Sequence, residues 1–118
     1  MRIMNILVTG GAGYVGSHAA RLLDRAGHDV WVYDNLSLGH SAAVPSGRLV
    51  KGDLLDQAAV EAALRDKRIE AVMHFAAFAL VGESVTDPQR YYRNNVIGSC
   101  TLFAAMKAAS VSRIVFSS

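Results

Sequence analysis

Regularly spaced glycines follow the first apolar run of the sequence. The segment Val8–His18 reads VTGGAGYVGSH, and Gly10, Gly13 and Gly16 within it have the spacing G-x-x-G-x-x-G. Between a strand and a helix, such glycines permit a tight turn, close approach of the backbone to a pyrophosphate and close helix packing. The first amides of that helix can bind phosphate oxygens. The spacing therefore predicts a dinucleotide site; a tight turn that binds no ligand is the alternative.

An acidic residue, Asp34, stands about 20 residues beyond the glycines, at the end of the next apolar run. A carboxylate at this place accepts hydrogen bonds from the ribose hydroxyls of an adenosine. It would repel a 2′-phosphate, so the sequence favours NAD over NADP. Asp34 could instead be a plain loop cap. The lysine of the mononucleotide phosphate loop G-x-x-x-x-G-K-[ST] is absent from the sequence.

Further polar and small residues follow the later apolar runs. Asp53 could reach the adenine edge, or it could only form the turn before the next helix. The small residues within Phe75–Ala77 would let the backbone border a cofactor, whereas His74 before them is expected in the core. One of Asn94 and Asn95 is expected to face the sheet or a ligand, with simple solvent exposure as the alternative.

Short β-branched runs alternate with segments of helical period, which is typical of βαβ units and a parallel sheet. We predict a Rossmann-type, doubly wound α/β sheet with strand order 3-2-1-4-5, whose ligand lies beyond the carboxyl ends of strands one and four. The expected strands are Asn5–Thr9, Asp29–Asp34, Arg48–Asp53, Ala71–Ala77 and Arg113–Ser118, and the expected helices run from Tyr14 to Ala26, from the cap Asp56 to Asp66, and from Asp87 to Ala109.

The helical periods also predict which side chains are buried. Gly27 is expected to end the first helix. Cys100 is expected to be a small buried residue on the third helix. The other expected inward positions are Val15, Ala19, Leu22 and Leu23 in the first helix, Val60, Ala63 and Leu64 in the second, and Val96, Leu102, Phe103 and Met106 in the third.

Composition narrows the class of protein. A length of 118 residues with 52% hydrophobic content fits one globular domain. No apolar stretch is long enough to span a membrane and no cleavage site follows the N-terminus, so we expect a soluble protein. The single cysteine suits the cytoplasm. A net charge of +2 with scattered basic residues argues against a nucleic-acid partner.

Five segments in this order carry a resemblance to a known family: VTGGAGYVGSH, VYDNLSLGH, KGDLLD, HFAAFALVGESV and YYRNNVIGS. Together they resemble the extended short-chain dehydrogenase/reductase superfamily and, within it, the UDP-glucose 4-epimerases. The resemblance covers nearly the whole chain. It implies a UDP-sugar substrate, bound NAD, and commonly a homodimer whose interface includes the helix around Tyr91 to Met106.

The resemblance also implies which residues contact NAD. These are Tyr14 and Val15 at the helix start, Asp34, Asn35, Leu36, Ser37, Leu38 and Gly39 around the adenosine, Asp53 and Leu54 at the adenine, Phe75, Ala76, Ala77, Phe78 and Ala79 along the pyrophosphate and nicotinamide ribose, and Asn94. Many of these epimerases have lysine at the position of Ala79. Related pentose-sugar 4-epimerases often have a neutral residue there, so the resemblance does not decide which sugar is the substrate.

The family's catalytic Tyr-x-x-x-Lys pair is absent, because no tyrosine here has a lysine four positions on. Ser117 and Ser118 align with the two serines that precede the family's catalytic serine. We therefore interpret residues 1–118 as an incomplete NAD-binding domain, the N-terminal part of a longer epimerase, and assign no catalytic residue. The alternatives are another nucleotide-sugar epimerase, dehydratase or decarboxylase, and a non-catalytic NAD-binding module.

Overall fold

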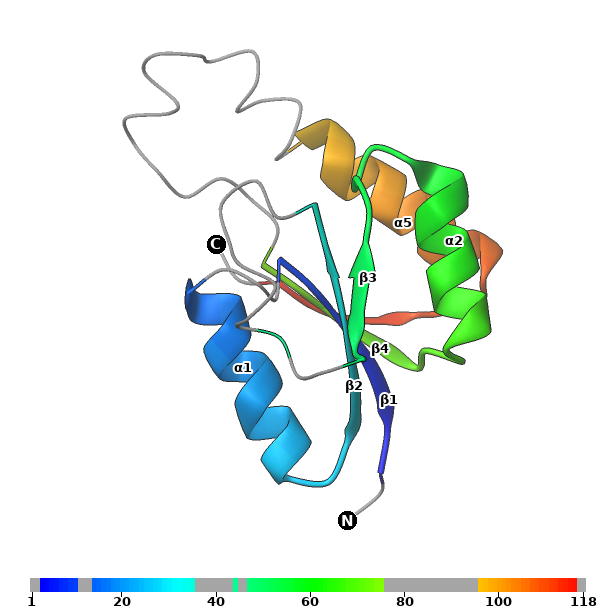
Figure 1. Ribbon diagram of the computed structural model, residues 1–118. Helices are drawn as coiled ribbons and strands as arrows, with labels where there is room; N and C mark the ends of the chain where they lie inside the picture. The colour runs from blue at the N-terminus through cyan, green and yellow to red at the C-terminus, as the bar shows by residue number, and fades with distance from the viewer. Residues whose placement is uncertain (1–2, 11–13, 36–43, 45–46, 76–95, 117–118) are drawn as a thin grey trace, which may run out of the picture.

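The computed structural model describes residues 3–10, 14–35, 44, 47–75 and 96–116 (Figure 1). Five parallel strands form one sheet in the order β3-β2-β1-β4-β5, which confirms the predicted fold class and strand order. The elements are β1 (Asn5–Thr9), α1 (Tyr14–Arg25), β2 (Asp29–Asp34), β3 (Leu49–Lys51), α2 (Gln57–Asp66), β4 (Ala71–His74), α5 (Gly98–Ala108) and β5 (Arg113–Phe116).

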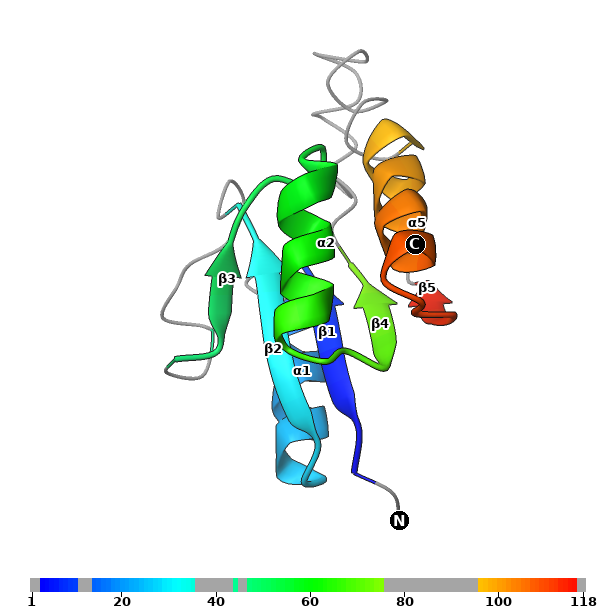
Figure 2. The same cartoon turned by 90° about the vertical axis from the view of Figure 1, so that its right-hand side faces the viewer.

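Helices cover the sheet on both faces, so each central strand is apolar on both sides. Figure 2 shows α2 and α5 in front of the sheet and α1 behind it. The core between the sheet and α2 and α5 contains Leu7, Tyr33, Val72 and Leu102. On the other face, buried side chains that include Val8 pack in a second cluster beneath α1. Alternation along each strand divides its residues between the two cores.

Two predicted local signals are confirmed, one at the start of α2 and one after the end of α1. Asp56 precedes α2, and its Oδ1 accepts a hydrogen bond from the Ala59 backbone N–H at 3.1 Å, which is the N-cap interaction. Gly27 follows α1 with φ of +94°, and its N–H donates to the Asp24 carbonyl at 3.0 Å. A residue with a side chain rarely adopts this left-handed conformation, which explains the glycine.

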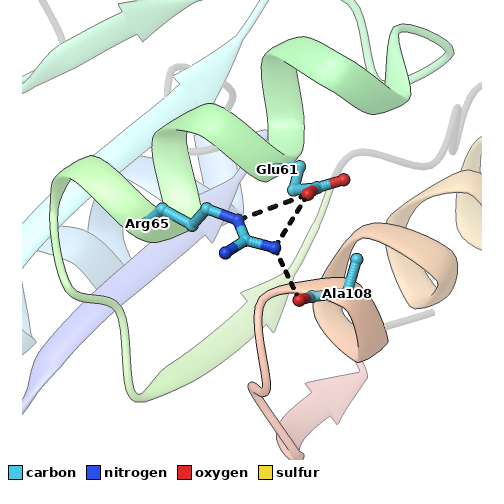
Figure 3. A network of polar contacts seen from close by, with 3 residues as sticks. All are labelled: Glu61, Arg65 and Ala108. Carbon is cyan, nitrogen blue, oxygen red and sulfur yellow. Dashed lines mark hydrogen bonds and ion pairs between the residues drawn. The ribbon is translucent and has the colours of Figure 1, made fainter.

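An arginine joins the two helices on the front face (Figure 3). Arg65 of α2 forms an ion pair with Glu61 one turn earlier at 3.0 Å. The same guanidinium group donates to the carbonyl oxygen of Ala108, the last residue of α5, at 2.7 Å. The positive charge therefore satisfies a carbonyl at the negative end of the α5 dipole and holds the two helix ends together.

Several element boundaries differ from the prediction. α1 ends one residue before Ala26, and β3 and β4 are shorter than the predicted strands because regular pairing ends at Lys51 and His74. Pairing of β5 is described as far as Phe116, and Ser117 and Ser118 of the predicted strand lie outside the described residues. Of the helix predicted to end at Ala109, the structure describes only the last part, since residues 76–95 lie outside the described ranges.

Some predicted burial is wrong. Leu22 is 65% exposed, because the inward stripe of α1 passes through the buried Gly16 and Ala20 to Leu23 and leaves Leu22 at its side. Cys100 on α5 is exposed because it lies off the stripe formed by Leu102, Ala105 and Met106.

Val96 and Phe103 are also exposed, at 43% and 41%. Phe103 stands over the edge strand β5, where its ring lies 5.6 Å from that of the likewise exposed Phe116. Within the described residues no helix is long and apolar enough to cross a membrane.

Candidate cofactor site

The carboxyl ends of the strands meet at one edge of the sheet, because all five strands are parallel. β1 pairs with β2 on one side and with β4 on the other. The helix that follows β1 covers the rear face, and the helix that precedes β4 covers the front face (Figure 2). The order therefore reverses between β1 and β4, which is where open α/β sheets bind ligands.

The glycine segment begins at this point with a residue in the left-handed conformation. Gly10 follows the last residue of β1 and has φ of +73°, a conformation that favours glycine. Its N–H donates to the carbonyl oxygen of Tyr33 on β2 at 3.0 Å. α1 then begins at Tyr14, and Gly16 is buried within its first turn. Gly10 has the left-handed conformation that the predicted tight turn requires. Residues 11–13 lie outside the described residues, so the rest of the turn and its binding of phosphate stay predictions.

The two acidic candidates stand at neighbouring strand ends. Asp34 is the last residue of β2 and Asp53 follows β3 by two residues. The N–H of Gly52 donates to the Asp34 carbonyl at 3.1 Å, which joins the two segments. The exposed Asp53 accepts a hydrogen bond through Oδ1 from the Leu55 N–H at 2.9 Å, so it does form the turn that the sequence offered as an alternative.

Other predicted residues lie partly in the core. The Leu54 side chain is 8% exposed and packs in the front cluster, so its backbone is the part that remains for an adenine. Asn35 is exposed beyond β2. Phe75 packs against the rear cluster, and its N–H donates to the Thr9 carbonyl at 2.8 Å.

Other predicted contact residues fall in segments without described side chains. The structure describes only the backbone of Tyr14 and Val15. Outside the described residues lie Gly13, Leu36, Ser37, Leu38, Gly39, Ala76, Ala77, Phe78, Ala79 and Asn94.

A buried histidine lies directly beneath the carboxyl edge. His74, predicted as a core residue, is 1% exposed. Its Nδ1 lies 2.6 Å from Oγ1 of Thr9 on β1, and its Nε2 lies 3.0 Å from Oγ of Ser99 on α5. Burial lowers the pKa of His74 from 6.5 to about 4, so the ring is neutral at pH 7. One hydroxyl then donates to the ring and the other accepts from it, which connects three elements.

Sequence reasoning did not single out Tyr33, which lies beneath the acidic residues. Its hydroxyl donates to the Asp53 carbonyl at 2.8 Å. Burial, followed by the charges of Asp56 and Asp53, raises its pKa to about 12, so the phenol remains a neutral donor. A signal was present in Gly52, because a glycine at a strand end often marks a close approach of another group.

Comparison with known proteins identifies the family. The profile of the NAD-dependent epimerase/dehydratase family matches residues 6–118. This chain belongs to that family. Among the curated members, a UDP-glucose 4-epimerase of Lactobacillus helveticus is 53% identical over 98% of this chain and 35% of its own length. One of Rhizobium meliloti (strain 1021) is 49% identical over 100% of this chain and 36% of its own length.

Solved structures of family members have the same fold. A UDP-glucose 4-epimerase from Brucella ovis in complex with NAD superimposes with a TM-score of 0.93 at 50% identity, over 98% of this chain and 35% of that one. Another structure is that of a UDP-glucose 4-epimerase from Stenotrophomonas maltophila with bound NAD and formylated UDP-arabinopyranose. It superimposes with a TM-score of 0.94 at 41% identity, over 98% of this chain and 37% of that one. The chain thus spans about a third of the length of these family members.

Proposed function

We propose that residues 1–118 are the NAD-binding domain, the N-terminal part, of a longer enzyme that interconverts UDP-glucose and UDP-galactose. The observation that carries this proposal is the left-handed turn at Gly10 beside Asp34, at the point where the strand order reverses, in a chain about half identical to UDP-glucose 4-epimerases. NAD supplies a hydride acceptor and donor, which inversion of a carbon in the sugar requires.

We assign the contacts to NAD as follows. The amides at the start of α1 would hold the pyrophosphate, with Gly10 and Gly13 admitting it closely. Asp34 would accept hydrogen bonds from the adenine ribose, and the segment of Asp53 and Leu54 would border the adenine. The other contacts that we propose are Tyr14, Val15, Gly16, the segment from Asn35 to Gly39, the segment from Phe75 to Ala79, and Asn94.

Replacing Asp34 is expected to change cofactor preference. The unmodified protein should bind NAD⁺ more tightly than NADP⁺, because the carboxylate bonds the ribose hydroxyls and repels a 2′-phosphate. Asp34→Ala should weaken the binding of NAD⁺ about tenfold, as expected when a charged hydrogen-bond partner is lost. The preference for NAD⁺ over NADP⁺ should therefore become smaller. Calorimetric titration of both dinucleotides measures this. Equal affinities in the unmodified protein would contradict the role of Asp34.

The activity itself is tested with the full-length protein that contains this chain. Purified with NAD, it should convert UDP-galactose to UDP-glucose, and absence of turnover would refute the proposed reaction. A UDP-pentose is the second candidate substrate, because the Stenotrophomonas maltophila structure holds formylated UDP-arabinopyranose and this chain has Ala79 where many hexose enzymes have lysine. Assaying both sugars with one preparation separates the two.

We also propose a cytoplasmic homodimer in which α5 contributes to the interface. The exposed Val96, Ile97 and Phe103 on or beside this helix support the proposal, since apolar groups of this size gain by contact with a partner. The exposed, unpaired thiol of Cys100 suits a reducing compartment. Sedimentation equilibrium of the full-length protein tests the dimer, and a monomeric mass would refute it.

A further inference from the structure

Tyr33 occupies a central place beneath the acidic side of the proposed site. It is among the largest buried side chains described, with 2% of its surface exposed, and it packs in the front core with Leu54 and Val60. It immediately precedes Asp34 at the end of β2. A residue with this burial cannot contact a ligand directly, so any effect on binding must pass through its neighbours.

Three separate contacts connect Tyr33 to the segments around the site. Its carbonyl oxygen accepts the N–H of Gly10 at 3.0 Å, and its hydroxyl donates to the carbonyl of Asp53 at 2.8 Å. Its hydroxyl oxygen and ring edge fill the space next to Gly52, where an added Cβ would lie nearest to the hydroxyl oxygen and 2.7 Å from the ring carbon Cζ. The same Gly52 donates its N–H to the Asp34 carbonyl at 3.1 Å.

These contacts join residues that are far apart in the sequence but adjacent at the carboxyl edge. We propose that Tyr33 is a positioning residue for the adenosine end of the dinucleotide: its side chain sets the place of Asp53 relative to Asp34 and the glycine turn. The inference rests on the proposed binding of NAD. It assigns to this side chain the adenosine half of the cofactor and not the nicotinamide half.

Tyrosine meets two requirements at once. Its ring has the volume to fill the gap left by the absent side chain of Gly52, and its hydroxyl is a donor that remains protonated at neutral pH. Phenylalanine would keep the ring but lose the donor and the oxygen atom nearest to Gly52. The Asp53 carbonyl also accepts the Asp56 N–H at 3.0 Å, so loss of the tyrosine hydroxyl would loosen this segment without leaving the carbonyl unpaired.

The test compares cofactor fragments on the full-length protein. In calorimetric titrations, Tyr33→Phe should weaken the binding of NAD⁺ and of ADP-ribose about fivefold, the effect of one hydrogen bond. The affinity for nicotinamide mononucleotide should not change. The control is Ile69→Val, which trims the same core, where Ile69 is 6% exposed and follows α2, whereas Asp53 precedes that helix. It should lower the melting temperature and change no affinity.

Each outcome decides the proposal. If Tyr33→Phe lowers only the melting temperature, or weakens nicotinamide mononucleotide equally, the positioning role is refuted while NAD⁺ binding stands. If the unmodified protein binds neither NAD⁺ nor ADP-ribose, the proposed function itself fails, and the positioning role fails with it.

A double-mutant cycle tests the contact between Gly52 and the Tyr33 side chain as a whole. Gly52→Ala should weaken NAD⁺ binding in the unmodified protein, because the new methyl group must displace the ring. In a Tyr33→Leu background the ring is gone, so the same substitution should have a smaller further effect. Equal effects in both backgrounds would show that Gly52 and the Tyr33 side chain are not coupled, and would overturn the part of this contact in the proposal.

Discussion

Acidification from pH 7 to pH 4 is expected to remove about 3 kcal/mol of unfolding free energy through His74 alone. In the unfolded chain this imidazole takes up a proton near pH 6.5, whereas burial lowers its pKa in the folded protein to about 4. The unfolded state therefore binds the proton first as the pH falls. Stability declines from pH 6.5 to about pH 4 and the contribution of His74 levels off below that.

Urea denaturation at pH steps between 7.5 and 4 measures this, with His74→Gln as the comparison. Glutamine keeps a hydrogen-bonding amide within the site of the ring but does not titrate. Carboxylates titrate in both proteins, so the difference between the two pH profiles isolates the imidazole. The variant should be less stable at pH 7 and should lose about 3 kcal/mol less on acidification. Parallel profiles would show that His74 is not held neutral by burial.

Gly10→Ala is expected to cost about 1–2 kcal/mol of stability and at least about tenfold in NAD⁺ affinity. The stability loss follows from φ of +73°, where a Cβ meets the following carbonyl oxygen. The affinity loss follows from displacement of the turn that leads into α1, since the amides that would bind the pyrophosphate move with it. Denaturation and calorimetric titration of the full-length protein give the two values.

Gly47→Ala provides a matched control. Gly47 has φ of +76°, nearly that of Gly10, and beyond its two chain neighbours no atom lies within 4 Å of an added Cβ. The substitution should therefore carry a similar conformational penalty without moving the glycine turn. Unchanged NAD⁺ affinity in this variant, beside a large loss in Gly10→Ala, would assign the loss to the turn. Equal affinity losses in both would assign it to destabilisation of the domain.

The fold was predictable to the level of strand order because the signals are local. β-Branched runs between helical periods predict a parallel sheet, and the handedness of crossovers leaves few orders to consider. Asp56 and Gly27 act on backbone groups within a few residues, so their capping roles follow from their immediate neighbours. Burial was less predictable. Phe103 was predicted to be buried but is exposed beside β5. A helical period identifies the apolar face of a helix, but it does not show which element packs against that face.

By itself, the sequence determined the order and type of the described strands and helices, the left-handed glycine after β1 and the acidic residue at the end of β2. Periodicity and turn chemistry act over short distances, which is why they could be read locally. Only the tertiary structure decided that the Tyr33 hydroxyl meets the Asp53 carbonyl and that His74 lies between Thr9 and Ser99. Those partners stand on different elements. Strand register and the packing of helices on the sheet bring them together, and no local pattern in the sequence encodes either.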